Sequence, residues 1–171
     1  YRLPDAELSV VYFPSCITRV MGSYPGQDKN LMETFLSVSR KAGIDVRILK
    51  GVEGSCCSQI YGSKGFSDAY RFAAAEIIDR LWDSSEGGLR PVVIDVSSCA
   101  YTLHHIRPVL DEARRKKFDA LRILDSVDYL HDLVLPRVGA VQATKRIVLH
   151  PVCSLEKMKT GDKLLAVARR F

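Results

Sequence analysis

The sequence predicts an α/β fold in which a mainly parallel sheet of about four to five strands carries helices on its flanks. Short apolar runs alternate along the chain with longer segments whose apolar residues recur at helical spacing. Strands that alternate with helices form parallel sheets, because each helix returns the chain to the start of the next strand. The candidate strands are 8–13, 45–49, 92–96, 123–124 and 146–149.

The segments between these strands carry the helix signals. Such helices would cover both faces of the sheet, which is a Rossmann-like arrangement. The predicted helices are 28–42 with Gly43 as its stop, a helix capped by Ser67 that runs through Trp82, one that opens at Cys99, one capped by Ser126 that ends at Pro136, and a last one over 164–167.

Length and composition fit one globular core and exclude several classes of protein. The chain has 171 residues, of which 47% are hydrophobic and 26% are charged, so it can bury about 70% of the surface that its unfolded form exposes. No apolar run approaches the roughly 20 residues of a membrane-spanning helix, and we find no secretory signal pattern. We expect a cytoplasmic protein, with peripheral attachment to the inner membrane as the alternative.

The formal net charge of +5 does not by itself indicate nucleic-acid binding. Basic residues are dispersed except for the run 114–117, which is predicted to form the last turn of a helix. Cations there complement the helix dipole. Neither interleaved aromatic residues nor a nucleic-acid-binding module accompanies the run.

Cysteines follow four of the candidate strands. Because the carboxyl ends of parallel strands meet at one edge of a sheet, we expect all five sulfurs there, where open α/β sheets bind ligands. Soft thiolate ligands gathered at one edge indicate a metal or iron–sulfur centre. The five residues are Cys16, the adjacent Cys56 and Cys57, Cys99, and Cys153.

The number and spacing of the cysteines limit the alternatives. Five cysteines are too few for a disulfide-stapled scaffold, and an odd number leaves one unpaired. In a reducing compartment, clustered cysteines more often bind metals or act in catalysis. Structural zinc usually takes cysteine pairs that are two to four residues apart, a geometry that the adjacent Cys56 and Cys57 do not offer. Iron–sulfur ligation is therefore favoured, and a zinc site or an iron-free thiol/disulfide module stays open.

Several neighbours are candidates to support the ligands. His150, Ser98 and Ser58 lie in the sequence at the predicted cysteine edge, where they can donate hydrogen bonds to ligand sulfurs. Cys99 is expected at a helix N-terminus, where the dipole favours a thiolate. Arg19 and Lys64 are placed to neutralise the charge of a cluster, but we interpret them by default as solvated loop cations.

The cysteine spacing resembles that of a known family. Cys16 is followed by 39 residues, Cys56-Cys57, 41 residues and Cys99, which is similar to the cysteine-rich CCG domain. Such domains occur in heterodisulfide reductase subunits, in glycolate and lactate oxidase iron–sulfur subunits, and at the end of FAD-linked, D-lactate-dehydrogenase-like oxidoreductases. The stretches 13–22, 58–66 and 150–158 resemble the last group most closely.

This resemblance implies an iron–sulfur, electron-transfer domain of an FAD-linked oxidoreductase that oxidises a D-2-hydroxy acid such as D-lactate or glycolate. The cysteines would ligate a [4Fe-4S] cluster, and FAD would bind elsewhere in the parent protein. Residues 1–145 would form a first CCG-type domain, and 146–171 the truncated start of a second, opened by Cys153 and packed on the same sheet. Expected partners are the rest of that polypeptide and an electron acceptor, either a protein or a quinone, but no nucleic acid.

The chain departs from the family pattern at two places, and it lacks one motif. Ser58 stands where the family has glycine, and the closing motif retains only Cys99, with Val96 at the earlier position. An ordinary [4Fe-4S] centre is therefore expected rather than the non-cubane cluster of heterodisulfide reductases. No strand-to-helix turn carries a dinucleotide fingerprint. We expect these residues not to be catalytic alone, and not to retain an intact cluster as an isolated piece.

Overall fold

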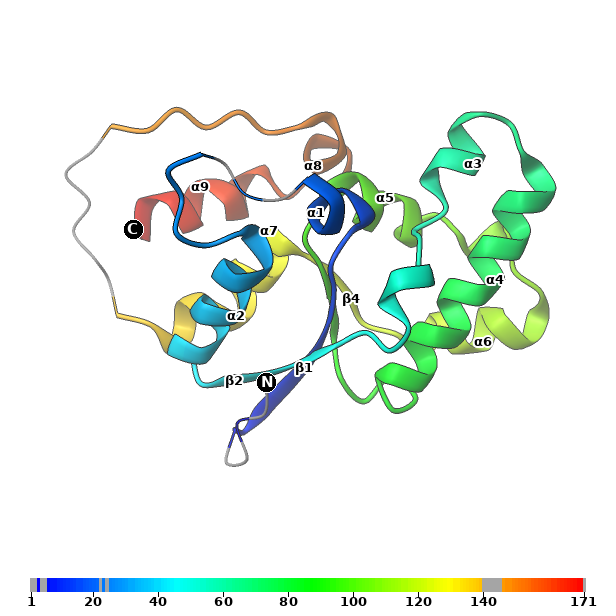
Figure 1. Ribbon diagram of the computed structural model, residues 1–171, viewed down its shortest axis with the longest axis horizontal. Coiled ribbons are helices and arrows are strands. Elements are labelled where there is room, and N and C mark those ends of the chain that lie inside the picture. The colour runs from blue at the N-terminus through cyan, green and yellow to red at the C-terminus, as the bar shows by residue number, and fades with distance from the viewer. Residues whose placement is uncertain (1–2, 4–5, 22, 24, 140–145, 171) are drawn as a thin grey trace.

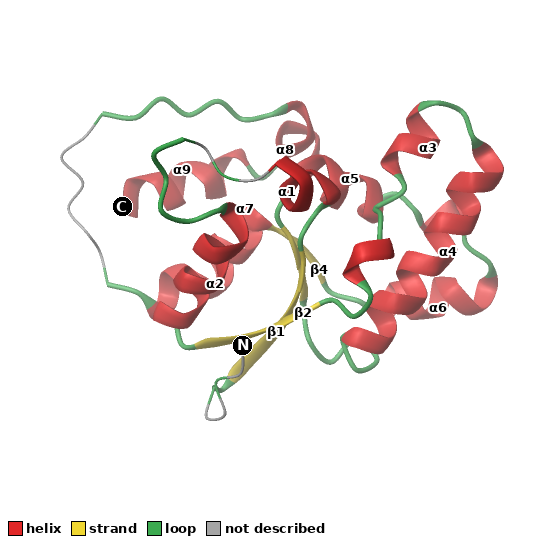
Figure 2. Ribbon diagram, in the orientation of Figure 1, coloured by secondary structure: helices red, strands yellow, loops and turns green. Residues whose placement is uncertain are grey.

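The computed structural model describes residues 3, 6–21, 23, 25–139 and 146–170, and it shows an α/β fold built on one sheet (Figures 1 and 2). Four strands lie parallel in the order β2–β1–β3–β4. Their bounds are Leu8–Phe13 (β1), Ile44–Ile48 (β2), Val92–Ile94 (β3) and Ile123–Asp125 (β4). The predicted parallel sheet with flanking helices is confirmed.

Helices cover both faces of this sheet. The first face carries α2 (Leu31–Lys41), α7 (Ser126–Tyr129) and α9 (Gly161–Arg170). The second carries α4 (Ser67–Ser84), α5 (Ser97–His104) and α6 (Glu112–Ala120). Three short helices complete the set, namely α1 (Cys16–Met21), α3 (Gln59–Ser63) and α8 (Cys153–Met158). Figure 1 shows α2, α7 and α9 on one side of the strands and α4 and α6 on the other.

The central strand β1 shows why the sequence folds in this way. Val10 and Tyr12 pack into the core on the α2 side, whereas Val11 and Phe13 pack into the core on the α4 side. Alternate residues of a strand point to opposite faces, and here all four are buried. Such a continuous apolar run is typical of a parallel strand that is covered on both faces.

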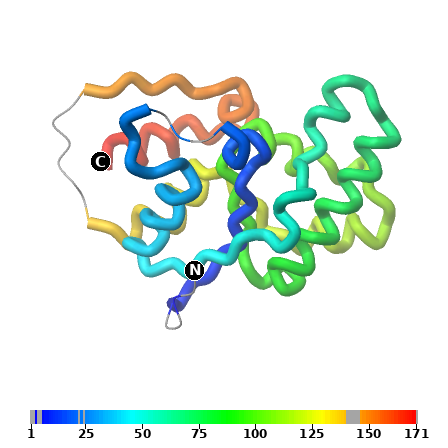
Figure 3. The backbone as a smooth tube through the Cα atoms, in the orientation of Figure 1, coloured from blue at the N-terminus to red at the C-terminus, as the bar shows by residue number. Residues whose placement is uncertain are grey.

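The prediction of a fifth strand at 146–149 is wrong. Residues 146–150 have no regular secondary structure and are exposed, with Val148 96% exposed. Figure 3 shows this part of the chain running outside the helices and away from the sheet until it reaches α8. A strand forms only where a neighbour pairs with its backbone, and the described sheet ends at β2 and β4.

The basic run 114–117 lies in the middle of α6, and only Lys117 reaches the last turn, in which the sequence predicts the whole run. Asp111 caps this helix by accepting a hydrogen bond from the Arg114 backbone N–H at 2.9 Å. The Arg114 and Lys117 side chains form ion pairs with Asp79 of α4 at 2.8 and 2.6 Å. Arg114 and Lys117 therefore tie α6 to α4.

Several predicted helix boundaries shift by a few residues. Helix α2 begins later than predicted because Asn30 and Glu33 form a capping box. Ser67 is the first residue of α4 rather than its N-cap. Asp125, not Ser126, caps α7, which continues as the π-helical turn Leu130–Val134 and the 3₁₀ turn Leu135–Arg137. The last helix is longer than predicted, and α1 and α8 were not predicted.

None of the helices in the described part of the chain combines the length and the apolarity that crossing a membrane requires.

Candidate metal centre

The strand order brings the cysteine loops to one edge of the sheet. Cys16 begins α1 directly after β1, Cys56 and Cys57 follow β2, and Cys99 is the third residue of α5 after β3. Strand β1 lies between β2 and β3. The connection after β1 leads to β2 on one side of it, and the connection after β2 leads to β3 on the other side. Ligands of open α/β sheets bind at such a switch point, beyond the carboxyl ends of the strands. The predicted common edge is thus confirmed for these four cysteines.

Cys57 and Cys99 form the closest pair among the described cysteines. The Cys57 thiol donates to Cys99 Sγ across a sulfur–sulfur distance of 3.0 Å. The two residues are only 5% and 4% exposed and belong to the core between the sheet and α4. The pair joins positions 42 residues apart in sequence, so only the tertiary fold creates it.

Cys56 lies beside this pair, but its side chain is less buried than those of Cys57 and Cys99. Its side chain is half-buried, and the Ser58 backbone N–H donates to its Sγ at 3.3 Å. The hydrogen bond with the Cys57 thiol, together with burial, raises the pKa of Cys56 well above its usual range. The hydrogen bond with Cys56 lowers the pKa of Cys57, but the contact with Cys99 and burial outweigh it and raise that pKa to about 12.

Ser58 occupies a position whose backbone conformation suits glycine. It is fully buried and adopts a left-handed backbone conformation with φ of 66°, which only glycine adopts without strain. Its hydroxyl donates to the Cys57 carbonyl oxygen. The backbone at Ser58 thus adopts the left-handed conformation that glycine favours, and the hydrogen bond of the serine hydroxyl offsets part of the strain.

Replacing Ser58 by glycine should therefore leave the free energy of unfolding unchanged or raise it by up to about 1 kcal/mol. Relief of the left-handed strain, roughly 1–2 kcal/mol, offsets the lost hydrogen bond of about 1 kcal/mol. Ser58→Val keeps the strain and adds a branched side chain, so it should lower stability by roughly 2–3 kcal/mol. Urea denaturation of both variants checks this, and a glycine variant that is less stable than the valine variant would contradict it.

Two arginines hold the cysteine loop from opposite sides. Arg19 of α1 donates to the Ser55 carbonyl oxygen at 2.8 Å. Arg80 of α4 donates to the Gly51 carbonyl oxygen at 2.7 Å and to Ser55 Oγ at 3.2 Å. Arg19 is half-buried and close enough to act on the charge of Cys56, so its interpretation as a solvated loop cation is wrong. Its spacing of three residues from Cys16 was the available signal.

Asp95 is a further site residue that the sequence did not single out. Its carboxylate accepts a hydrogen bond from the Ser15 backbone N–H at 2.9 Å and from the Tyr12 hydroxyl at 2.6 Å. These contacts connect the ends of β1 and β3, the strands that precede Cys16 and Cys99. Asp95 therefore fixes the two sides of the switch point relative to each other.

The remaining predicted site residues are more exposed than the buried pair. Cys16 and Cys153 are exposed at the first residues of α1 and α8. His150 is exposed in the segment that precedes α8, and Ser98 is half-buried in the first turn of α5. Helix α8 nevertheless packs against α5, which keeps Cys153 on the helix next to the one that carries Cys99.

The arrangement of the side chains near the cysteine loop can be compared with the ligand geometry that a metal ion requires. Among the described residues, no group of three or more His, Cys, Asp or Glu side chains is arranged to hold a metal ion. Two thiolates on one tetrahedral metal with bonds of about 2.3 Å lie about 3.8 Å apart. The 3.0 Å contact of Cys57 and Cys99 is shorter than this, so it is that of paired thiols rather than of two ligands of one metal.

Searches against protein-family models, curated proteins and solved structures returned no match for this chain.

Proposed function

We propose that this chain is an iron–sulfur-binding, electron-transfer part of an FAD-linked oxidoreductase that oxidises a D-2-hydroxy acid. The observation that carries the proposal is the buried Cys57–Cys99 pair with Cys56 beside it, at the edge where α/β sheets bind ligands. Cys16 would supply the fourth thiolate. A [4Fe-4S] cluster, when bound, accepts and releases single electrons.

The chain's own residues would set the properties of that centre. Burial of Cys57 and Cys99 keeps water from their sulfurs. The Ser58 N–H donates to Cys56 Sγ, Arg19 places a positive charge nearby, and the first turn of α5 offers its dipole to Cys99. The reduction potential of an iron–sulfur cluster depends on hydrogen bonds to its sulfurs, on net charge and on solvent exposure. The N–H donor, the arginine and the helix dipole would favour the reduced, more negative state of the cluster.

The rest of the reaction would take place outside these residues. In this proposal, FAD in another part of the parent protein takes the hydride from the hydroxy acid, and an acceptor protein or a quinone receives the electrons. The thiols would stay reduced in the cytoplasm. Which hydroxy acid is oxidised depends on the flavin domain.

A repeated unit supports the proposed second module after residue 145. Helices α1 and α8 each have six residues, begin with cysteine and end with methionine. Pro14 and Pro151 each stand two residues before that cysteine, and each follows an apolar run. In the first unit that run is β1, paired on both sides. The run 146–149 would be its counterpart in the second unit, although it is unpaired in the structure.

The runner-up function is an iron-free thiol/disulfide module. The 3.0 Å contact between Cys57 and Cys99 favours it, because two thiols at that distance are placed to oxidise. The raised pKa values of Cys56 and Cys57 disfavour the thiolate that both disulfide exchange and metal ligation require, so they do not separate the two functions. The third sulfur, that of Cys56 beside the pair, favours ligation, because a disulfide needs only two sulfurs. We therefore rank iron–sulfur ligation first.

Anaerobic reconstitution separates the two functions. The chain is incubated with ferrous iron, sulfide and a reductant, desalted without oxygen, and assayed for iron and acid-labile sulfide. We expect iron and sulfide to be bound together but in less than stoichiometric amount, with visible charge-transfer absorption that disappears in air, because an intact cluster is not expected on these residues alone: Cys16 is exposed and three sulfurs gather around the core. Zinc bound without sulfide, or no bound metal at all, would overturn the proposal.

A further inference from the structure

Strand β2 forms an open edge of the sheet. The order of the described strands places β2 and β4 at its two ends. Strand β4 has three residues, whereas β2 has five. The N–H and C=O groups of an edge strand accept a further strand unless a proline, a bulge or a covering segment prevents it. Within Ile44–Ile48 there is no proline, and the pairing with β1 runs without a bulge.

The pairing with β1 determines which backbone groups of β2 face outward. The Leu49 N–H donates to the Tyr12 carbonyl oxygen of β1 at 2.9 Å. In a parallel pair, successive residues turn their N–H and C=O groups to alternate sides of the strand. Every second residue counted back from Leu49 therefore pairs with β1, and the residues between them point away from it. The outward-pointing residues are Ile44, Val46 and Ile48.

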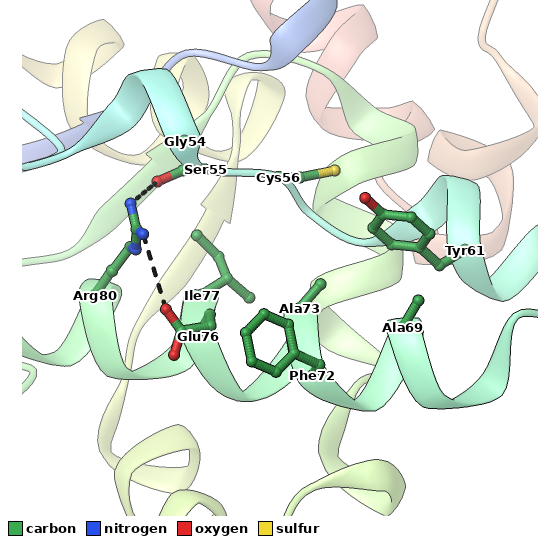
Figure 4. Close-up of a pocket in the computed structure, with 10 residues that line it drawn as sticks. All are labelled: Gly54, Ser55, Cys56, Tyr61, Ala69, Phe72, Ala73, Glu76, Ile77 and Arg80. Atoms are coloured by element: carbon green, nitrogen blue, oxygen red, sulfur yellow. Dashed lines mark hydrogen bonds and ion pairs between the residues drawn. The ribbon is translucent and has the colours of Figure 1, made fainter.

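The space beside this edge is accessible. A hollow of about 430 Å³ is bordered by the second half of β2, the end of α4 and the turn after it. It shares no lining residue with the pocket of about 220 Å³ beside the cysteine loop, which Figure 4 shows. Ile48 borders the hollow and is 40% exposed, although Ile44 and Val46 on the same face of β2 are buried against α2. The edge thus combines outward backbone groups with an exposed apolar side chain.

We propose that a second copy of this chain docks on β2, so that two β2 strands pair antiparallel about a two-fold axis at Val46. Val46 then lies opposite Val46 of the second copy, and Ile44 lies opposite Ile48 at both ends. Residues that face each other in this way exchange both of their N–H and C=O groups, which gives about six hydrogen bonds in all. The contact is self-complementary, as a two-fold dimer requires, and it joins the two sheets into one.

The charges of β2 select this register. Asp45 and Arg47 lie on one face of the strand, and about this axis each lies opposite the other residue of the second copy. These are the positions without cross-strand hydrogen bonds, where facing side chains are closest. Moving the axis by one residue brings Asp45 opposite Asp45, or Arg47 opposite Arg47. Like charges directly opposite destabilise a sheet, whereas opposite charges stabilise it.

Both charged residues are already held in place within one copy. The Asp45 carboxylate accepts hydrogen bonds from the Leu3 N–H and the Ser9 hydroxyl, each at 2.9 Å. Arg47 forms an ion pair with Glu86 at 2.8 Å and lies 3.6 Å from the Asp45 carboxylate. A carboxylate accepts several donors, and a guanidinium has five N–H groups. The second copy therefore adds an opposite charge to each residue without replacing its present partners.

The dimer is tested by sedimentation of the metal-free chain under reductant, which prevents links between the exposed cysteines. One strand from each copy makes a small interface, so we expect a reversible dimer with a dissociation constant of about 1–100 µM. Ile48→Pro removes an outward N–H at each end of the interface, and an edge strand tolerates proline there. Its dissociation constant should rise at least about tenfold.

Arg47→Glu tests the register. It places two carboxylates opposite each other, so it should also weaken the dimer at least about tenfold. Two controls make the same changes away from β2, and each should alter the dissociation constant less than about twofold. Arg71→Glu reverses an exposed charge on α4, and Val148→Pro changes a residue that is 96% exposed in the unpaired run 146–149.

Thermal unfolding shows which variants are folded, and Arg47→Glu carries the test if Ile48→Pro is not. A wild type that stays monomeric at about 500 µM overturns the inference, and so does a folded Ile48→Pro or Arg47→Glu variant that dimerises as the wild type does. A dimer that is lost in Val148→Pro but kept in Ile48→Pro would assign the contact to the run 146–149 instead. No iron is present, so the outcome is independent of the proposed function.

Discussion

Replacing Cys57 with serine should reduce the iron and sulfide bound on anaerobic reconstitution to background. Cys57 is the residue that links the cysteine loop to α5, because its thiol contacts both Cys56 and Cys99. A serine hydroxyl is a hard, weakly acidic donor and does not replace a thiolate toward iron. Iron and sulfide analysis of the reconstituted proteins measures the effect.

Cys153→Ser is the matched control for that experiment. Cys153 is exposed at the start of α8, and we assign it to the second module rather than to the first ligand set. Its replacement should leave most of the bound iron in place. Since Cys57 is buried, Cys57→Ser also costs about 1–3 kcal/mol of stability, so urea denaturation must show that the variant is folded. Full iron and sulfide in the folded Cys57→Ser variant would remove Cys57 from the ligand set.

Much of the fold could be predicted because its signals are local. The run 8–13 coincides with β1, and the other three strands were placed within one or two residues. The run 146–149 has the same local character, yet it is unpaired. Strand formation depends on neighbours distant in sequence, and an apolar run does not reveal whether they exist. Short helices such as α1 and α8 were not predicted for a different reason, because six residues are too few to show helical periodicity.

The sequence predicted the edge of the sheet at which the cysteines lie, but not which of their sulfurs are in contact. The strand ends predicted which edge carries the cysteines, because parallel topology alone determines that edge. Which sulfurs meet depends on side-chain direction. Cys56 and Cys57 are adjacent, yet one lines a surface pocket and the other enters the core. Asp95 and Arg80 were not recognised because their contacts are 80 or more and 25 or more residues distant in sequence.

Oxidation of the metal-free protein should join Cys57 to Cys99 in a disulfide. Their sulfurs are 3.0 Å apart and need to approach by about 1 Å to reach bonding distance. With glutathione disulfide as the oxidant, the two thiols lose two electrons and two protons, and the glutathione disulfide becomes two thiols. The bond would close a loop between positions 42 residues apart, which stabilises the fold by about 4 kcal/mol.

This oxidation should be slow at neutral pH and faster in alkali. The thiolate attacks, and the pKa of Cys57 is about 12, so the rate should rise about tenfold for each pH unit between roughly pH 7 and 10. A Cys16→Ser, Cys153→Ser background removes the exposed thiols that would react first. Peptide mapping without reductant should then recover the Cys57 and Cys99 peptides as one linked species. Wild-type protein oxidised in the same way, which keeps Cys16, should bind no iron until it is reduced. A Cys56–Cys99 link, or iron binding that survives oxidation, would show that the buried pair is not the core of the metal centre.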